Sequence, residues 1–148
     1  MVKDQFGEDL LGTLKKWMLE EKKQPGKGIR GAKSALQKFP VIGEPGAEKI
    51  LLFSKLAPVA AVPSAFVGVP MRLWFGETGK NYAADYRAAR EILSAGLDET
   101  FEARQRAYLL LKKHGQEICK RSKPKCEICP LTGPCAYFQA KAADSNAE

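Results

Sequence analysis

The sequence lacks the features that mark membrane-spanning and secreted proteins. Among its 148 residues, the longest uncharged run extends from Leu56 to Met71 and contains three prolines. A membrane-spanning helix needs about 20 apolar residues, and proline interrupts a helix interior, so we expect no membrane association. The N-terminal residues carry early charges and no apolar core, so no secretory signal is evident. We therefore expect a cytoplasmic protein.

The sequence also lacks the apolar–polar alternation of β-strands and any internal repeat. Apolar residues recur instead at helical spacing, which predicts an all-α protein. Asn81 and Asp98 are the expected N-caps of the last two predicted helices, and Gly115 is the expected end of the last one. The proline-containing stretch 56–75 is expected to form a short extended piece and then a kinked helix. The other helices are predicted over about 8–22, 31–39, 47–56, 82–95 and 99–114.

Cysteine is absent from most of the chain, and its four cysteines all lie between Cys119 and Cys135. Disulfides are rare in a reducing cytosol, so clustered thiols indicate ligands for a metal ion or cluster. The spacing is Cys-x6-Cys-x2-Cys-x5-Cys, and the x2 pair, Cys126 and Cys129, lets two sulfur atoms converge from one turn. Four thiolates suit tetrahedral zinc or an iron–sulfur cluster. The spacing rules alone leave both open.

Positive charge is in excess, with 24 Lys and Arg against 17 Asp and Glu, a formal net charge of +7. Such an excess favours a polyanionic partner. Four of the cations lie in the six-residue segment 120–125 between the first two cysteines, which we call the basic loop. They are Lys120, Arg121, Lys123 and Lys125. Contacts between these side chains and phosphates would make binding salt-dependent.

The cysteine spacing, at the C-terminal end of an all-helical chain, resembles the [4Fe–4S] loop of the endonuclease III-like helix-hairpin-helix family of DNA repair proteins. The resemblance covers about residues 10–138. It implies a structural [4Fe–4S] cluster on the four cysteines, with zinc as the alternative, and a basic loop that contacts DNA. The implied partner is double-stranded DNA, damaged or abasic, in a cytoplasmic, nucleoid-associated protein.

The segment 39–47 resembles the hairpin of that family, whose usual pattern is Leu-Pro-Gly-Val-Gly. Gly43 matches the second hairpin glycine, whereas Val41 stands where the first is expected. Glycines let such a turn adopt positive φ and bring backbone amides close to a phosphate. The N-terminus of the next helix adds its partial positive charge. The resemblance therefore implies DNA contacts at Gly43, Gly46 and Lys49.

Two positions depart from the catalytic pattern of the family. Its bifunctional enzymes carry a lysine after the hairpin, whose amine attacks the sugar, and an aspartate that assists departure of the base. Pro45 and Pro63 occupy the matching positions here, so we predict no catalytic residue. An active glycosylase or lyase would need a substitute such as Lys49, Glu44 or Glu48.

The resemblance also predicts how the chain is divided. Residues 1–97 are expected to form a partial helical-barrel lobe with the helix-hairpin-helix at 31–56. Residues 98–138 are expected to form a helix and the cluster loop, followed by a disordered tail at 139–148. Only 39 residues precede the hairpin proline, so we expect an incomplete lobe, either through deletion or through an upstream start. An alternative of another class is a small zinc-stabilised adaptor that binds protein or RNA.

Overall fold

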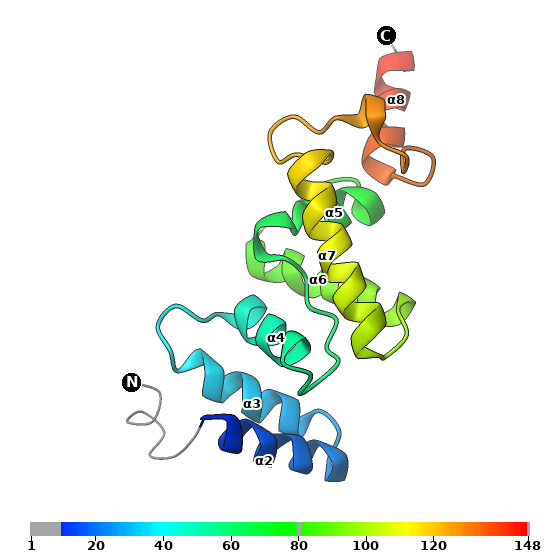
Figure 1. Cartoon of the computed structure of the whole chain (residues 1–148). Coiled ribbons are helices and arrows are strands. Elements are labelled where there is room, and N and C mark those ends of the chain that lie inside the picture. Colours follow the sequence, from blue (N-terminus) through cyan, green and yellow to red (C-terminus); the bar gives the residue numbers. More distant parts are fainter. Residues whose placement is uncertain (1–9, 80, 148) are drawn as a thin grey trace.

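The predicted all-α class is confirmed by the structure, a computed structural model that describes residues 10–79 and 81–147 (Figure 1). These residues form helices joined by turns, and no strand occurs among them. The predicted start of the first helix at about residue 8 lies outside the described residues. None of the helices in the described ranges is both long and apolar enough to cross a membrane.

The first two described helices, α2 (Leu10–Lys23) and α3 (Lys27–Gln37), pack closely along each other. A Cβ atom at Gly31 would overlap the indole ring of Trp17, so this approach requires glycine. α3 begins earlier than predicted because the Glu21 carboxylate caps it from α2. Its oxygens accept hydrogen bonds from the backbone N–H groups of Gly26, at 2.6 Å, and Ile29, at 2.9 Å. Burial raises the pKa of Glu21, but these hydrogen bonds bring it below its ordinary value.

The hairpin is completed by α4 (Glu44–Phe53), which follows the turn 38–43. α4 begins three residues earlier than predicted because Pro45 fits the first turn of a helix, where its missing N–H costs nothing. Gly43, the N-cap, has φ of −95°. The expectation of positive φ at this turn is therefore wrong, and Gly43 uses no conformation reserved for glycine.

An extended segment, 57–63, runs between two hydrophobic cores. Ala57, Val59 and Ala61 pack into the first core with α2, α3 and α4, whereas Ala60 and Val62 pack into the second. The short helices η1 (Ser64–Phe66), α5 (Gly68–Pro70) and the π-helix η2 (Met71–Phe75) follow. This confirms the predicted extended piece and kinked helix, because the prolines prevent a single straight helix.

Two longer helices, α6 (Tyr82–Gly96) and α7 (Phe101–Glu117), complete the two cores. Asn81 caps α6 as predicted, accepting a hydrogen bond of 2.9 Å from Ala84 N. The predicted cap at Asp98 is wrong, since Thr100 Oγ1 accepts the capping bond of 3.1 Å from Ala103 N. The predicted helix end at Gly115 is also wrong. Gly115 is buried against Phe66, so its small size serves packing.

The turn between α6 and α7 is held by Arg104, a buried residue of α7. Its guanidinium donates hydrogen bonds to four backbone carbonyls, those of Pro58, Ser94, Leu97 and Asp98, at 2.7 to 3.4 Å. Three of these carbonyls lie at or just after the end of α6, where carbonyl groups have no N–H donor within the helix. Arg104 thus joins the end of α6 to the extended segment.

The chain ends in the cysteine segment, with η3 (Cys126–Ile128), and in α8 (Ala136–Ala147). The sequence predicts a disordered tail over 139–148, whereas the structure continues α8 through Ala147. The Gln139 side chain donates hydrogen bonds to the carbonyls of Thr132, at 2.9 Å, and Gly133, at 3.2 Å. The alanine content of this segment favours a helix, which explains the difference.

Candidate metal and nucleic-acid site

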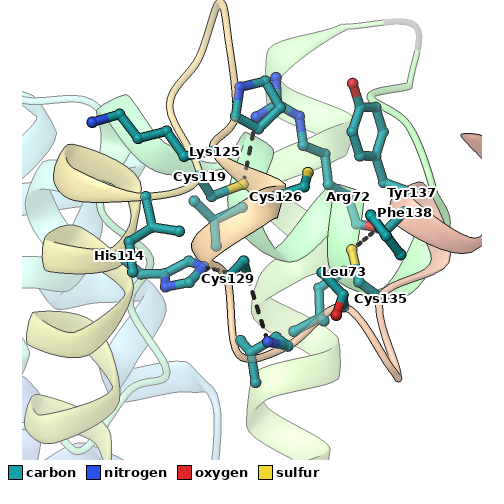
Figure 2. Close-up of a pocket in the computed structure, with 15 residues that line it drawn as sticks. Arg72, Leu73, His114, Cys119, Lys125, Cys126, Cys129, Cys135, Tyr137 and Phe138 are labelled. Atoms are coloured by element: carbon teal, nitrogen blue, oxygen red, sulfur yellow. Dashed lines mark hydrogen bonds between the residues drawn. The ribbon is translucent and has the colours of Figure 1, made fainter.

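The four cysteines, predicted as ligands, line one cavity between α7, η2 and α8 (Figure 2). All four side chains are half-buried. Burial raises the pKa of the Cys126 thiol, and the neighbouring Cys119, Cys129 and Cys135 raise it further. The other three cysteines therefore lie close enough to Cys126 to disfavour its thiolate form.

Polar groups surround the sulfur atoms. Arg72 Nη1 lies 3.4 Å from Cys119 Sγ, and Leu131 N lies 3.4 Å from Cys129 Sγ. His114 Nε2 lies 3.6 Å from the same Cys129 Sγ, and burial lowers the pKa of His114. N–H donors directed at sulfur stabilise thiolates and tune the centres that these thiolates hold.

Arg72 connects the cysteine segment to η2. Besides contacting Cys119, its guanidinium donates hydrogen bonds to the carbonyls of Lys120, at 2.8 Å, and Arg121, at 2.7 Å. It also lies over the Tyr137 ring, 5.2 Å from the centroid. Sequence reasoning missed this residue. One signal was available, because Arg72 is the sole charge between Lys55 and Glu77 in an otherwise apolar segment.

The cavity shared by the described cysteines is not a preformed site for a metal ion. Within the described ranges, no group of three or more His, Cys, Asp or Glu side chains could hold one metal ion.

The residues predicted to contact DNA fall into two separate groups. Those of the basic loop are all exposed and adjoin the cysteine cavity, and Lys125 also lines it. Those of the hairpin, Gly43, Gly46 and Lys49, lie at and inside the start of α4, in the other half of the molecule (Figure 1). Gly43 and Lys49 are exposed, and Gly46 is half-buried. The structure therefore brings the basic loop, but not the hairpin, next to the cysteines.

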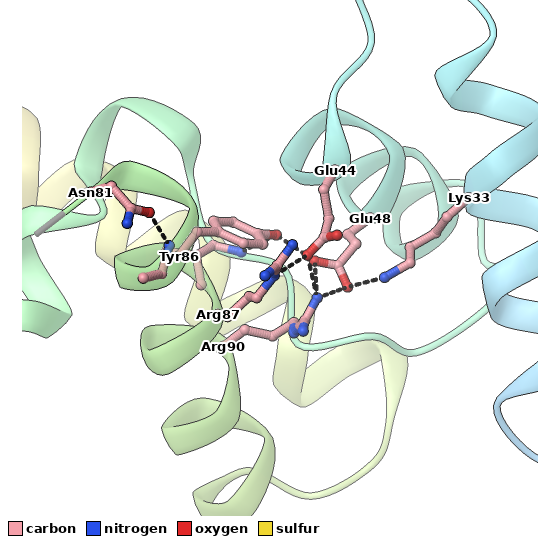
Figure 3. Close-up of polar contacts among 9 residues, drawn as sticks. Lys33, Glu44, Glu48, Asn81, Tyr86, Arg87 and Arg90 are labelled. Carbon is pink, nitrogen blue, oxygen red and sulfur yellow. Dashed lines mark hydrogen bonds and ion pairs between the residues drawn. The ribbon is translucent and has the colours of Figure 1, made fainter.

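The two positions that the resemblance aligns with catalytic residues, Pro45 and Pro63, are both prolines. Pro63 is buried and Pro45 is half-buried. Of the nearby carboxylates, Glu48 is buried, and both Glu44 and Glu48 form ion pairs with Arg90 (Figure 3). Both glutamates are therefore engaged by the Arg90 guanidinium.

Comparison with known proteins places these observations in context. No family model matches the chain. Over 103 residues it is 33% identical to endonuclease III of Rickettsia prowazekii (strain Madrid E), an alignment that covers 70% of this chain and 45% of that protein. The chain thus spans less than half the length of the relative that it matches. The similarity supports a distant relationship to endonuclease III, and the all-helical structure fits that relationship.

Proposed function

We propose that this chain is a DNA-binding iron–sulfur protein of the endonuclease III-like family that lacks the usual lysine–aspartate catalytic pair. One observation carries the proposal. Four cysteines at a spacing that resembles the cluster loop of the family line a single cavity, and N–H donors face their sulfur atoms. Four exposed cations occupy the loop between the first two cysteines.

The cysteine spacing, which resembles the cluster loop of the family, favours a cluster over zinc. A tetrahedral zinc ion with Zn–S bonds of about 2.3 Å draws its four sulfur atoms together around one point. A [4Fe–4S] cluster binds each thiolate to a different iron atom and spreads the sulfur atoms further apart. Either centre would draw its four thiolates from one cavity, which the four cysteines share. When bound to Cys119, Cys126, Cys129 and Cys135, the cluster would act as a structural cross-link with redox-active iron.

The proposed nucleic-acid interface combines two kinds of contact. The basic loop offers exposed cations to phosphates, and the hairpin offers the positive N-terminal end of α4 beside the exposed Gly43. The combination of basic loop and hairpin, together with the distant similarity to endonuclease III, supports double-stranded DNA as the partner, including damaged or abasic DNA. A location at the nucleoid would follow from such binding.

The absence of catalysis is proposed from the residues at the matched positions. Proline has neither a nucleophile nor a carboxylate, so Pro45 and Pro63 cannot replace lysine and aspartate. Lys49 is exposed, and its Nζ lies 6.0 Å from the centroid of the Tyr108 ring rather than in a desolvated pocket. A nucleophilic lysine needs desolvation or a neighbouring cation to lower its pKa.

The cluster is tested by purifying the protein anaerobically and measuring iron, acid-labile sulfide and zinc per chain. We expect about four irons and four sulfides, with broad absorbance near ~400 nm. Cys135→Ser should reduce this absorbance, whereas Ser122→Ala in the neighbouring loop should not. A colourless protein with one zinc per chain would refute the cluster and favour the adaptor alternative.

DNA binding is tested by the salt dependence of affinity for a labelled duplex. Neutralising the four cations of the basic loop with glutamine should reduce the slope of log K against log salt by about 3.6, since each phosphate contact contributes about 0.9. Lys112→Gln and Lys113→Gln, exposed cations of α7, are the matched controls. An unchanged slope would show that the loop does not contact DNA phosphates.

The absence of catalysis is tested by borohydride trapping on abasic DNA. We expect no covalent adduct, and an adduct that is abolished by Lys49→Ala would refute the absence of catalysis.

A further inference from the structure

A buried polar cluster joins the hairpin to α6 (Figure 3). Arg90 of α6 reaches both glutamates at the start of α4. Its Nη1 lies 2.8 Å from Glu44 Oε1 and 3.1 Å from Glu48 Oε2. The Tyr86 hydroxyl donates a hydrogen bond of 2.7 Å to Glu48 Oε1, and Lys33 Nζ of α3 lies 3.5 Å from Glu48 Oε2. α4 is therefore held from both sides.

The charges in the less exposed part of this cluster balance, and the exposed Arg87 is an additional cation beside Glu44. Two carboxylates, of Glu44 and Glu48, face two largely buried cations, Lys33 and Arg90, whose side chains are 16% and 22% exposed. Burial lowers the pKa of Arg90, but Glu48 and Glu44 together raise it above its ordinary value, so the guanidinium stays charged. Buried ion pairs contribute little net stability relative to apolar packing. The main effect of the cluster is therefore expected on the position and charge of the hairpin.

Glu44 occupies a critical place because it is the first residue of α4, directly after Gly43. A carboxylate there suits the helix dipole, yet it would repel a phosphate approaching the same N-terminus. Arg90 contacts this carboxylate, and the exposed Arg87 lies 3.8 Å from it. The counter-charge comes from α6, more than 40 residues further along the chain.

We propose that Arg90 is a positioning residue of the hairpin, which fixes the first turn of α4 through Glu44 and Glu48 and cancels the charge that Glu44 would present to a nucleic-acid phosphate. This inference rests on the proposed DNA binding by the hairpin. It adds that the hairpin is competent to bind only when α6 supplies the counter-charge.

The test uses the full chain and a fluorescein-labelled DNA duplex of about 20 base pairs, with affinity measured by anisotropy at two salt concentrations. Arg90→Gln should bind about tenfold more weakly at low salt, because one uncompensated charge then lies near a phosphate. The deficit should shrink at high salt, where charges are screened. Arg90→Lys, which keeps the charge, should bind within about threefold of the parent.

The decisive variant is the double substitution Arg90→Gln with Glu44→Gln. It removes the half-buried Glu44 carboxylate as well, so affinity should return to within about threefold of the parent. The remaining deficit measures the loss of the anchor that fixes the first turn of α4. Gln105→Ala, which removes a 2.9 Å hydrogen bond to Leu52 O at the opposite end of α4, controls for a general loss of packing and should bind as the parent does. Thermal unfolding confirms that each variant is folded at the assay temperature.

The possible results separate this inference from the proposed function. Parent-like binding by folded Arg90→Gln, or a double variant that binds no better than Arg90→Gln, overturns the role of Arg90 while DNA binding stands. A parent chain that does not bind the duplex overturns both. If Arg90→Gln does not fold, the exposed Arg87→Gln replaces it. It should bind about twofold more weakly, because Arg87 is more solvated, and unchanged binding then refutes charge compensation by α6.

Discussion

Replacing Gly115 with alanine sets two effects of opposite sign against each other. Gly115 lies within α7, where alanine is favoured over glycine by about 1 kcal/mol in an exposed helix interior. However, Gly115 is buried, and a Cβ built there would lie 2.7 Å from Cγ and 3.0 Å from Cβ of Phe66. Carbon atoms pack best at about 3.5–4.0 Å. The added methyl group therefore overlaps η1.

Rotation of the Phe66 ring cannot relieve this overlap, because the Cβ of Phe66 is fixed to the backbone of η1. Overpacking of this kind costs about 1–3 kcal/mol. Set against the gain in helix propensity of about 1 kcal/mol, it should leave Gly115→Ala less stable than the parent by up to about 2 kcal/mol. The overlap also forces α7 away from η1 just before Cys119, so the variant should lose a bound cluster faster.

The assay is urea denaturation followed by circular dichroism, with Gly96→Ala as the matched control. Gly96 ends α6, and a methyl group added there would meet no neighbouring atom within 4 Å. This control should therefore be neutral or more stable by a few tenths of a kcal/mol, since helix propensity alone changes. If Gly115→Ala unfolds at the same urea concentration as the parent, or at a higher one, the packing argument is wrong.

Three further predictions concern side chains that hold segments together. Arg72→Met removes the hydrogen bonds between η2 and the cysteine segment, so cluster absorbance should decay faster in air, and an unchanged lifetime would contradict this role. Arg104→Met leaves four carbonyls without their donor and should lower the free energy of unfolding by about 3–5 kcal/mol, whereas a loss below about 1 kcal/mol would show that water replaces the guanidinium. Because the pKa of Glu21 is lowered in the fold, its stabilising effect is present above its ordinary value of 4.5 and is lost as the pH falls through the folded value. Thermal unfolding of Glu21→Gln should therefore depend less on pH than that of the parent below about pH 5, and parallel curves would refute this.

The helices could be predicted from sequence because apolar spacing and capping residues act locally. Asn81 was recognised as a cap by its residue type alone. Residue type does not distinguish Asp98 from Thr100 as the cap of α7, since both are good capping residues. The carbonyl of Asp98 accepts hydrogen bonds from Thr100 N, at 2.8 Å, and from Arg104 Nε, at 3.2 Å, contacts that favour the later start.

In the candidate site, too, local features could be predicted from the sequence, whereas contacts between residues far apart in the chain could not. The cysteine spacing is a local signal, and the structure gathers the four residues in one cavity. The contacts of Arg72 with the cysteine segment join residues 47 to 49 positions apart. Glu48 likewise meets Tyr86 and Arg90, 38 and 42 residues away. Helical periodicity cannot reveal such partners, so Glu48 could be predicted from sequence only as an ordinary residue of the first turn.

The location of positive charge distinguishes the two halves of the proposed interface. The basic loop carries four exposed cations, but a [4Fe–4S] cluster with its four thiolates would contribute about −2 beside them, which offsets about half of their charge. The hairpin carries a smaller surplus, because Glu44 and Glu48 match two of the three cations around them, Lys33, Arg87 and Arg90. Its contribution is expected to come mainly from backbone amides and the helix end, which are less sensitive to salt than cation–phosphate contacts. The loop would therefore set how steeply affinity falls with salt, and the hairpin, whose Glu44 is compensated by Arg90, would set the affinity that remains when salt is high.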